Sequence, residues 1–329
     1  MITKKYKVLG IGNAIVDILA DVGDSFLEER NLQKGAMKII DKLEVKKLHS
    51  CIKTVKEMSG GSVANTIAAL SLLGNKVAFI GKVGNDKLGK SFEKDLKSLG
   101  VNYCTLNDNG MPTACCIVLT TPDAQRTMNT YLGVSGFLKL DDIDETSIAQ
   151  SEILYLEGYL FDSSEAKEAF KKAINIAIKT GGRVALSLSD SFCVKRHKSE
   201  FLSIVKKYTS ILFANEEEIL ALFGVKNIED AIGNCARIRN ISVITRSEKG
   251  SIVVSDGKVD KIAAKKNNNI IDTTGAGDIY AAGFLHGVIK GMDPGSCGRL
   301  GAAIASKVLS QFGARLDKSV IELINKDGF

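Results

Sequence analysis

Three glycine-bearing stretches of the chain have residue types that suit phosphate binding. They are GIGNAI at residues 10–15, GNDKLGKS at residues 84–91 and IDTTGAGDIYAAGF at residues 271–284. Glycine lets the backbone approach an anion closely, and the amide groups at a helix N-terminus point toward such an anion. Each stretch therefore predicts a nucleotide site, and the neighbouring residues decide among the three.

The first two stretches are weak candidates. Residues 10–15 begin like a dinucleotide-binding fingerprint, but Ile15 stands where the third glycine belongs and an extended segment follows, so we discount NAD. Residues 84–91 fit the Walker A pattern G-x-x-x-x-G-K-[ST] and lie between a predicted strand and a predicted helix. Asp86, however, places a carboxylate inside that phosphate loop, and no strand ends in a convincing Walker B aspartate. The alternative is an ordinary strand-to-helix turn.

The third stretch is the strongest candidate. Gly275, Ala276 and Gly277 are all small and lead directly into a long apolar helix. Their N–H groups would form an anion site that stabilises the charge on a transferring phosphoryl group. Asp278 follows in the first turn, where a carboxylate can accept the proton of an acceptor hydroxyl. An aspartate that only caps the helix is the alternative, but a cap does not require two flanking small residues.

Strand-like segments alternate with helical segments along most of the chain. The predicted strands cover residues 6–12, 77–83, 153–156, 184–188, 211–214 and 242–245. The predicted helices cover residues 63–73, 89–99, 164–180, 217–223, 230–239, 278–289 and 296–310. This alternation predicts an α/β, doubly wound fold with a mostly parallel sheet and helices on both faces. Ligands in such folds bind beyond the carboxyl ends of the strands.

Two regions depart from that alternation. Strand-like segments at 15–22, 36–40, 113–120 and 126–132, with a turn at 121–125, predict a small second sheet that is discontinuous in sequence. We expect one domain over residues 1–329, with a lid subdomain formed by about 14–41 and 103–133 that excludes water from the substrate. An edge extension that serves only dimerisation is the alternative. Asp256-Gly257 between two apolar runs predicts a further hairpin.

Bulk composition excludes several classes of protein. The 329 residues are 45% hydrophobic and 25% charged, as in a soluble globular protein. The net charge of +6 is dispersed and no basic stripe with aromatics stands out, so we expect no nucleic acid as partner. No apolar run reaches membrane-spanning length. Seven cysteines, an odd number without a CxxC pair, predict reduced thiols and a cytoplasmic protein.

Two motifs together resemble the signatures of the PfkB, or ribokinase-like, carbohydrate and nucleoside kinases. DTTGAGDIYAAGF, within residues 271–284, is similar to the C-terminal signature, and GGSVAN at residues 60–65 is similar to the other. The resemblance covers nearly the whole chain in order and spacing. It implies a ribokinase-like fold, ATP and Mg²⁺, and it leaves open whether a potassium ion near Asp272 is needed. It also implies that GNDKLGKS is a structural turn.

The resemblance assigns roles in phosphoryl transfer residue by residue. Asp278 matches the catalytic base, and Gly275, Ala276 and Gly277 match the anion hole. Arg126, in the predicted lid hairpin, resembles an arginine that reaches the phosphates on closure; a surface residue beside Asp123 is the alternative.

The resemblance also places the nucleotide. Asn215 and Glu218 match an Asn-x-x-Glu motif that organises magnesium, largely through water, and phosphate. Without the family, that acidic run predicts a helix start with charges favourable to the helix dipole. Thr245, Ser247 and Gly250 match the loop that lies along ATP, in which relatives usually carry glycine in place of Ser247.

The acceptor pocket resembles that of adenosine kinases more than that of ribokinases. Asn13 and Asp17 have the adenosine-kinase spacing, and Ser62 stands where ribokinases carry lysine. A carboxylate such as Asp17 can accept hydrogen bonds from two vicinal ribose hydroxyls. The other residues implied in substrate binding are Gly60, Gly61, Asn65 and Tyr159, an aromatic that would stack on a base or else only pack at a strand end. Glu157 argues for a free sugar, because ribokinases bind ribose with a glutamate there.

The sequence therefore predicts a kinase of the 5′-hydroxyl of a ribonucleoside, with adenosine to AMP in purine salvage as the first choice. The first alternative is a sugar kinase acting on ribose or a ketohexose. The second is a regulator that binds a nucleoside or sugar without catalysis. We expect a monomer or a homodimer.

Overall fold

The strands of the predicted α/β alternation form one large sheet. The computed structural model describes residues 2–104, 108, 110–123, 125–267, 269–311 and 313–316. Within these residues the main sheet has 9 strands, in the order β14-β13-β12-β11-β10-β9-β1-β5-β6. The strands are β1 (Tyr6–Ile11), β5 (Val77–Ile80), β6 (Asn102–Tyr103), β9 (Ser151–Glu157), β10 (Arg183–Ser187), β11 (Ile211–Asn215), β12 (Ile241–Thr245), β13 (Ser251–Ser255) and β14 (Lys258–Ile262). All pair in parallel except β12 with β13 and β13 with β14, the predicted hairpin.

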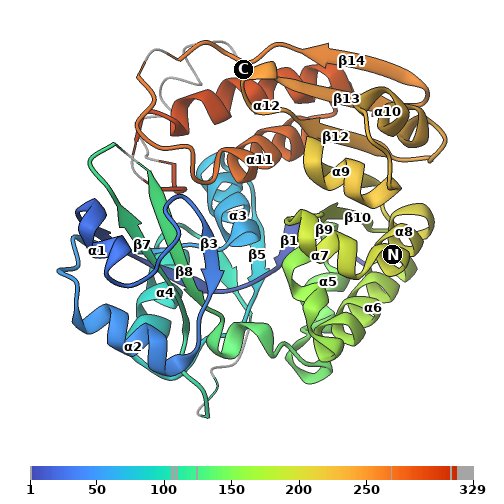
Figure 1. The fold of residues 1–329 in the computed structure, drawn as a ribbon. Coiled ribbons are helices and arrows are strands. Elements are labelled where there is room, and N and C mark those ends of the chain that lie inside the picture. Colours follow the sequence, from blue (N-terminus) through green and yellow to red (C-terminus); the bar gives the residue numbers. More distant parts are fainter. Residues whose placement is uncertain are drawn as a thin grey trace.

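Helices cover both faces of this sheet (Figure 1). One face packs against α3 (Ser62–Leu72), α4 (Lys87–Ser98), α11 (Ala276–Ile289) and α12 (Pro294–Val308). The other face packs against α5 (Glu145–Ala149), α6 (Ser164–Lys179), α7 (Ser191–Arg196), α8 (Lys198–Lys207), α9 (Glu216–Phe223) and α10 (Ile228–Ala236). Because both faces are covered, central strands are apolar without alternation, and every residue of β5 is buried. Among the described helices, none combines the length and apolar character that a membrane span needs.

A second sheet stands beside the main one, as predicted. Within the described residues it has 5 strands in the order β3-β8-β7-β2-β4. These are β2 (Ile15–Asp21), β3 (Met37–Ile39), β4 (Lys56–Ser59), β7 (Ala114–Thr120) and β8 (Arg126–Tyr131). Sequence patterns missed β4, which lies outside the expected lid bounds. Residues 105–107, 109 and 124 of the expected lid lie outside the described residues.

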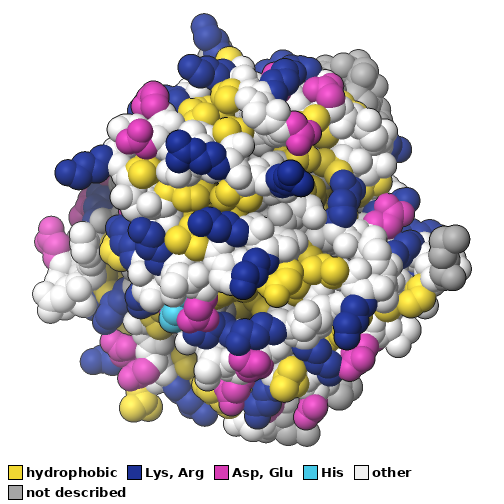
Figure 2. All heavy atoms as spheres, turned by 90° about the vertical axis from the view of Figure 1, so that its right-hand side faces the viewer, with side chains coloured by type: hydrophobic (Ala, Val, Ile, Leu, Met, Phe, Trp, Pro, Cys, Tyr) yellow, Lys and Arg dark blue, Asp and Glu magenta, His cyan; other side chains and the backbone are white. Residues whose placement is uncertain are grey.

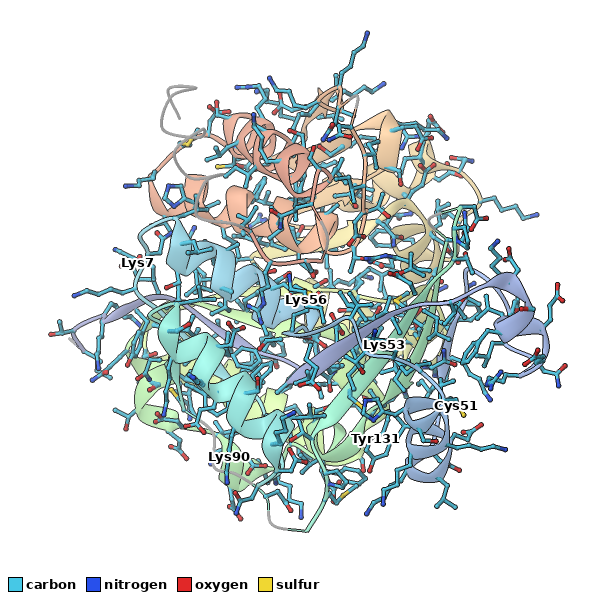
Figure 3. The ribbon with its side chains drawn as sticks, turned by 90° about the vertical axis from the view of Figure 1, so that its left-hand side faces the viewer. Lys7, Cys51, Lys53, Lys56, Lys90 and Tyr131 are labelled. Atoms are coloured by element: carbon cyan, nitrogen blue, oxygen red, sulfur yellow. The ribbon has the colours of Figure 1, made fainter. Side chains whose placement is uncertain are left out.

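The register of the second sheet decides which side chains face the main domain. Short helices α1 (Asp24–Glu28) and α2 (Lys42–Ser50) cover the face that carries Ile18 and Ile117. Asp17 pairs with Cys116, and Arg126 pairs with Thr120, an even number of residues farther along β7. Asp17 and Arg126 therefore share the opposite face, which α1 and α2 leave open. Figure 3 views the molecule from the left-hand side of Figure 1, where α1 and α2 lie, with Lys56 on β4 and Lys90 on the neighbouring α4.

Candidate active site

The predicted site residues meet at the carboxyl edge of the main sheet. Asn13 follows β1, Glu157 ends β9, Asn215 ends β11 and Thr245 ends β12. Since parallel strands run in one direction, these side chains lie along one edge, where α/β folds bind ligands. The N-termini of the adjacent helices α3 and α11 add Ser62 and Asp278 to the same place.

Asp278 is held by donors from α3. The Ser62 hydroxyl donates to Oδ1 at 2.6 Å, and Asn65 Nδ2 donates to Oδ2 at 2.9 Å. Thr66 donates to the Asp278 carbonyl oxygen at 3.0 Å. Burial raises the pKa of Asp278 to about 6, while these two side-chain hydrogen bonds and the charge of Arg315 oppose that rise. The carboxylate is therefore fixed in orientation, and its pKa lies close to neutrality, as general-base catalysis requires.

The loop before α11 provides open backbone amides. Gly275 has φ 74°, and a Cβ there would lie 2.3 Å from Ala314 Cβ, so both conformation and packing require glycine. A Cβ on Gly277 would meet no heavy atom within 4 Å, so space is open beside this residue. The first amide groups of a helix have no intrahelical acceptor. Ala276 N–H donates to the Thr273 carbonyl oxygen at 3.3 Å, so the amides of Gly275 and Gly277 are the ones that this loop can present to an anion.

Glu157 is committed to internal hydrogen bonds. Its Oε1 accepts from Asn13 Nδ2 at 2.8 Å, and its Oε2 accepts from the backbone N–H groups of Asn13 at 3.3 Å and Val63 at 3.1 Å. The side chain is 1% exposed, and burial raises its pKa to about 7. Glu157 thus ties the end of β1 to the first turn of α3.

Asp17 and the Gly60-Gly61 pair lie against one another. A Cβ on Gly60 would lie 2.5 Å from Asp17 Oδ2, and a Cβ on Gly61, which has φ 91°, would lie 2.2 Å from the Asn13 carbonyl oxygen. Only glycine allows this close approach. Burial raises the pKa of Asp17 to about 7, with Arg315 and Arg126 acting against the rise.

Two buried amide oxygens in this region lack partners. Asn13 Oδ1 and Asn65 Oδ1 accept no hydrogen bond among the described residues, although each amide nitrogen is bonded to a carboxylate. Buried polar atoms are rarely left unpaired, so a ligand or water that donates hydrogen bonds is expected there. Hydroxyl groups of a sugar ring have that chemistry.

Asn215 and Glu218 form the start of α9. Glu218 N–H donates to Asn215 Oδ1 at 2.8 Å, and the Glu218 carboxylate accepts from Asn215 N–H at 3.0 Å and from Asn215 Nδ2 at 2.7 Å. This is the helix start that acidic residues alone predict. Each carboxylate oxygen retains a free lone pair that can accept from metal-bound water, so the pair also fits an indirect magnesium site. Burial raises the pKa of Glu218 to about 7.

The loop after β12 lies beside α9. Thr245 pairs with Asn215 across the parallel strands. Ser247 has φ 50°, the left-handed conformation that glycine favours. A Cβ on Gly250 would lie 2.0 Å from the Ile262 carbonyl oxygen, so this position also needs glycine.

Arg126 of β8 reaches the loop before α11. Its Nη2 lies 2.5 Å from Asp272 Oδ2, and its Nη1 donates to Thr274 Oγ1. Asp272 also accepts from Thr274 N–H at 2.8 Å and from Gly313 N–H at 2.6 Å. The second sheet is thus connected through Arg126 to the loop that carries the proposed anion hole, and Arg126 is not the isolated surface residue of the alternative interpretation.

Sequence reasoning missed Arg315. Its Nε and Nη1 donate to the carbonyl oxygens of Ser59 at 3.0 Å and Ala64 at 2.9 Å, on either side of the glycine pair. The residue belongs to no predicted motif, so no sequence signal pointed to it. Tyr159, by contrast, was predicted; it follows β9 in the short 3-10 helix Gly158–Asp162 and is 39% exposed, so its ring has a free surface.

The comparisons with known proteins agree with this geometry. Residues 37–320 match the family model described as pfkB family carbohydrate kinase. The chain belongs to the PfkB family. The solved structure of adenosine kinase from Sinorhizobium meliloti has TM-score 0.92 and 41% identity, covering 98% of this chain and 100% of that one. A probable sugar kinase from Rhizobium etli CFN 42 has TM-score 0.93 and 37% identity, covering 99% of each chain. A 5-dehydro-2-deoxygluconokinase from Clostridium perfringens is 27% identical over 81% of this chain and 82% of its own length.

In this PfkB kinase, GNDKLGKS is a structural turn. Asp86 accepts from Gly89 N–H at 2.8 Å as the N-cap of α4 and from the Thr113 hydroxyl at 2.6 Å. The carboxylate therefore occupies the loop that a Walker A motif would leave to phosphate. The ribokinase-like fold that the sequence predicted is confirmed.

A second group of potential ligands lies away from the site. Single ligand atoms of Asp162, Cys193 and His197 lie within 4.8 Å of one another. Arg196 donates to both oxygens of Asp162, at 3.1 and 2.5 Å, and burial raises the pKa of Cys193 to about 12. A protonated thiol and a carboxylate already bound to arginine are poor metal ligands. The seven cysteines are free, as predicted.

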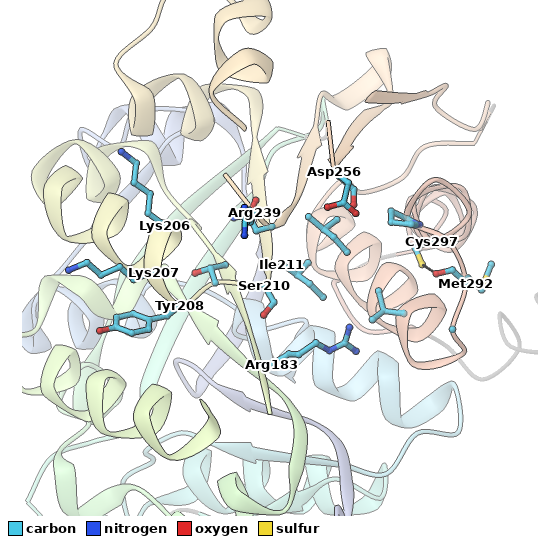
Figure 4. A pocket seen from close by; sticks show the side chains of 17 residues that line it. Arg183, Lys206, Lys207, Tyr208, Ser210, Ile211, Arg239, Asp256, Met292 and Cys297 are labelled. Carbon is cyan, nitrogen blue, oxygen red and sulfur yellow. Dashed lines mark hydrogen bonds between the residues drawn. The ribbon is translucent and has the colours of Figure 1, made fainter. Parts of the chain in front are cut away.

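The amino edge of the main sheet differs from the carboxyl edge. The first residues of β10, β11 and β12 border a cavity of about 710 Å³ (Figure 4). Lys206, Lys207 and Tyr208 project away from it, and Arg183 and Arg239 stand at its border. Figure 2, viewed from the side of α8 and α10, shows Lys and Arg side chains scattered over the surface with acidic groups between them. This agrees with the dispersed charge in the sequence.

Proposed function

We propose that this PfkB kinase transfers the γ-phosphoryl group of ATP to the 5′-hydroxyl of a ribonucleoside, with adenosine as the preferred acceptor and AMP as product. That activity would serve purine salvage. The solved adenosine kinase from Sinorhizobium meliloti, at 41% identity over nearly the whole chain, supports this choice.

The observation that carries the proposal is the contrast between two carboxylates, the buried Glu157 and the half-buried Asp17. Glu157 accepts three hydrogen bonds from within the protein. Asp17 forms no hydrogen bond with another described side chain and lies beside the glycine pair. A half-buried carboxylate without protein donors is suited to receive the two vicinal hydroxyls of a ribose. The adenosine-kinase-like carboxylate is therefore the available one, and the ribokinase-like carboxylate is used for structure.

The chain's own residues then supply each requirement of the transfer. Asp17, Asn13 and Asn65 orient the ribose through their free acceptor atoms. Asp278 accepts the proton of the 5′-hydroxyl as that oxygen attacks. The amides of residues 275–277 stabilise the charge of the transferring group, and Arg126, released from Asp272, pairs with the phosphates. Tyr159 stacks on the base.

The nucleotide lies along the neighbouring strand ends. Asn215, Thr245, Ser247 and Gly250 would line ATP, and Glu218 would accept hydrogen bonds from water bound to Mg²⁺. The magnesium ion supplies charge neutralisation on the phosphates when bound. Both oxygens of Asp272 are occupied by protein donors, so a potassium ion near it would need backbone carbonyls.

The second sheet acts in this proposal as the lid. Its open face carries Asp17 and Arg126, one for the acceptor and one for the phosphates, so closure would assemble both halves of the site. A single domain with this lid, a cytoplasmic location and a monomeric or dimeric state remain predictions.

A sugar kinase is the second candidate. The probable sugar kinase from Rhizobium etli and the 5-dehydro-2-deoxygluconokinase relative favour it, as does the presence of Glu157 itself. A non-catalytic regulator is the third candidate, and the intact Asp278 constellation argues against it.

The deciding experiment measures ADP release from ATP and Mg²⁺ with adenosine, inosine, ribose and fructose supplied separately. We expect turnover with adenosine and none with the free sugars. Turnover with ribose or fructose alone would make Glu157 the relevant carboxylate and would overturn the nucleoside assignment. Binding of an acceptor with no ADP release would support the regulator.

A further inference from the structure

Arg315 lies after α12 and reaches across the site to the turn that begins α3. Its two hydrogen bonds end on the carbonyl oxygens of Ser59 and Ala64, which flank the Gly60-Gly61 pair. One rigid guanidinium therefore holds both ends of the glycine turn. This is the backbone that lies against Asp17 and the Asn13 carbonyl oxygen.

The guanidinium of Arg315 lies near carboxylates but forms no direct ion pair with them. Asp17 and Asp278 both interact electrostatically with this guanidinium. Among the described residues Arg315 forms no direct ion pair with either, and its Nη2 is buried with no hydrogen-bond partner. An unpaired buried guanidinium nitrogen is costly, so the position is expected to have a function that offsets the cost.

We propose that Arg315 is a positioning residue for phosphoryl transfer, which holds the glycine turn at residues 59–64 against the acceptor and places its positive charge near Asp17 and Asp278. The inference rests on the proposed kinase function. Arg315 would be a charged residue of the site that lies outside the motifs identified in the sequence.

The electrostatics support this role. Burial raises the pKa of Asp278 to about 6 and that of Asp17 to about 7, and Arg315 opposes both changes. Burial also lowers the pKa of Arg315, to about 10, which still leaves the guanidinium charged at neutral pH. Without this cation, Asp278 would hold its proton to higher pH and could not accept another.

The surrounding groups leave Arg315 as the available cation. The other titratable groups that interact with Asp17, Asp278 or Arg315 are Asp95, Cys115, Cys116, Arg126, Tyr155, Glu157, Tyr159, Glu218 and Asp272. Of these only Arg126 is positive, and it is paired with Asp272. Arg315 is therefore the positive charge in this group that no carboxylate neutralises by direct contact.

The test compares the pH dependence of kcat/KM in the wild type, Arg315→Met and Arg315→Lys. It uses whichever of adenosine, inosine, ribose or fructose the wild type phosphorylates, or acceptor-free ATP hydrolysis if none is used, so that a wrong substrate assignment stays separate from this inference. We expect Arg315→Met to move the acid limb upward by about one pH unit. Arg315→Lys should keep the limb near the wild-type position but raise the acceptor KM several-fold, because an ammonium cannot reproduce the two-carbonyl fork.

The matched control is Lys82→Met. Lys82 is a buried cation that pairs with Asp142 at 3.0 Å, outside the proposed site. Its loss should lower the melting temperature without moving the acid limb. A folded Arg315→Met with an unshifted limb would overturn the proposal. If Arg315→Met does not fold, an acid limb of kcat/KM that moves by a full pH unit in Arg315→Lys would overturn the proposal. Failure of both variants to fold would also overturn the proposal.

Discussion

The two edges of the main sheet differ in the burial and the partners of their charged side chains. The site at the carboxyl edge contains the buried Glu157 and the half-buried Asp278, and β2 of the second sheet adds the half-buried Asp17. Hydrogen-bond donors hold Glu157 and Asp278, and the charges of Arg315 and Arg126 act on Asp17. The amino edge carries Arg183 and Arg239 on the surface, and among the described residues neither forms an ion pair. Both edges are made by the same strands, so the strands themselves do not explain the difference.

The comparison shows where the fold keeps charged groups that lower its stability and that serve the proposed function. Moving a charged group out of water costs roughly several kcal/mol unless partners in the protein compensate. Buried charges therefore persist only where the chain supplies those partners. Exposed cations cost almost nothing and need no partners. The carboxyl edge is therefore expected to respond strongly to substitution and to pH, whereas the amino edge is expected to respond weakly.

The largest effect should follow Asp278→Asn. The amide keeps the size of the side chain but cannot accept the hydroxyl proton, so we expect kcat to fall at least ~100-fold with acceptor affinity roughly kept. Steady-state kinetics and calorimetric binding of the acceptor check this. A loss below tenfold would mean that Asp278 is not the base, and the contrast between the two edges would lose its functional meaning.

The next largest effect should follow Arg126→Met. This change removes the proposed phosphate contact and leaves Asp272 without its cation, so we expect kcat/KM for ATP to fall roughly 10- to 100-fold. The melting temperature should also fall, because a buried carboxylate loses its partner. Arg196→Met is the matched control, since Arg196 pairs with the partly exposed Asp162 at 2.5 Å, away from the proposed site. An equal loss of ATP kinetics in both variants would contradict a specific role for Arg126.

The pH dependence sharpens the comparison, because activity and stability should change in opposite directions. Asp278 and Asp17 have pKa values of about 6 and 7, above the usual value near 4 for aspartate, as folded-state burial dictates. Below about pH 6 the base becomes protonated, so kcat/KM should fall by about tenfold per pH unit. Between about pH 4 and 7 the folded chain binds more protons than the unfolded chain, so the contribution of these groups to stability decreases as pH rises.

Two measurements on one pH series check this prediction. Kinetics give the acid limb, and urea unfolding gives the free energy of unfolding. In Asp278→Asn the decrease in stability over this window should become smaller, because one of the titrating groups is gone. A free energy of unfolding that rises from pH 5 to 7 and does so equally in both proteins would contradict the assignment.

The smallest effect should follow Arg183→Gln with Arg239→Gln. These side chains border the cavity at the amino edge, are exposed and have no ion-pair partner among the described residues. Surface substitutions of this kind usually change stability by less than about 0.5 kcal/mol. We expect kcat/KM within about twofold of the wild type. A tenfold change in kcat/KM would show that the amino edge is coupled to the site, and the two edges would then not differ in their effect on activity.

The sequence by itself determined the fold class and most of the motif residues. Alternating apolar segments predicted the main sheet, and residues 271–284 predicted a helix start with small residues beside Asp278, because such patterns follow from local backbone geometry. Because successive side chains of a strand alternate between its faces, Cys115 and Cys116 lie on opposite faces of β7: Cys115 packs with Ile117 under α2, and Cys116 pairs with Asp17. Local patterns missed β4, whose Lys56 and Glu57 are exposed at a sheet edge and give no apolar signal.

The tertiary structure alone decided which charges meet. Glu157 and Asp17 are both carboxylates at plausible positions in the sequence, but only packing against Val63 and Asn13 shows that Glu157 is occupied. Arg315 is far in sequence from Ser59 and Ala64, and no local pattern predicts a contact between segments about 250 residues apart. Such contacts depend on how α3, α11 and the second sheet come together, and that arrangement is set by burial over the whole chain rather than by any one segment.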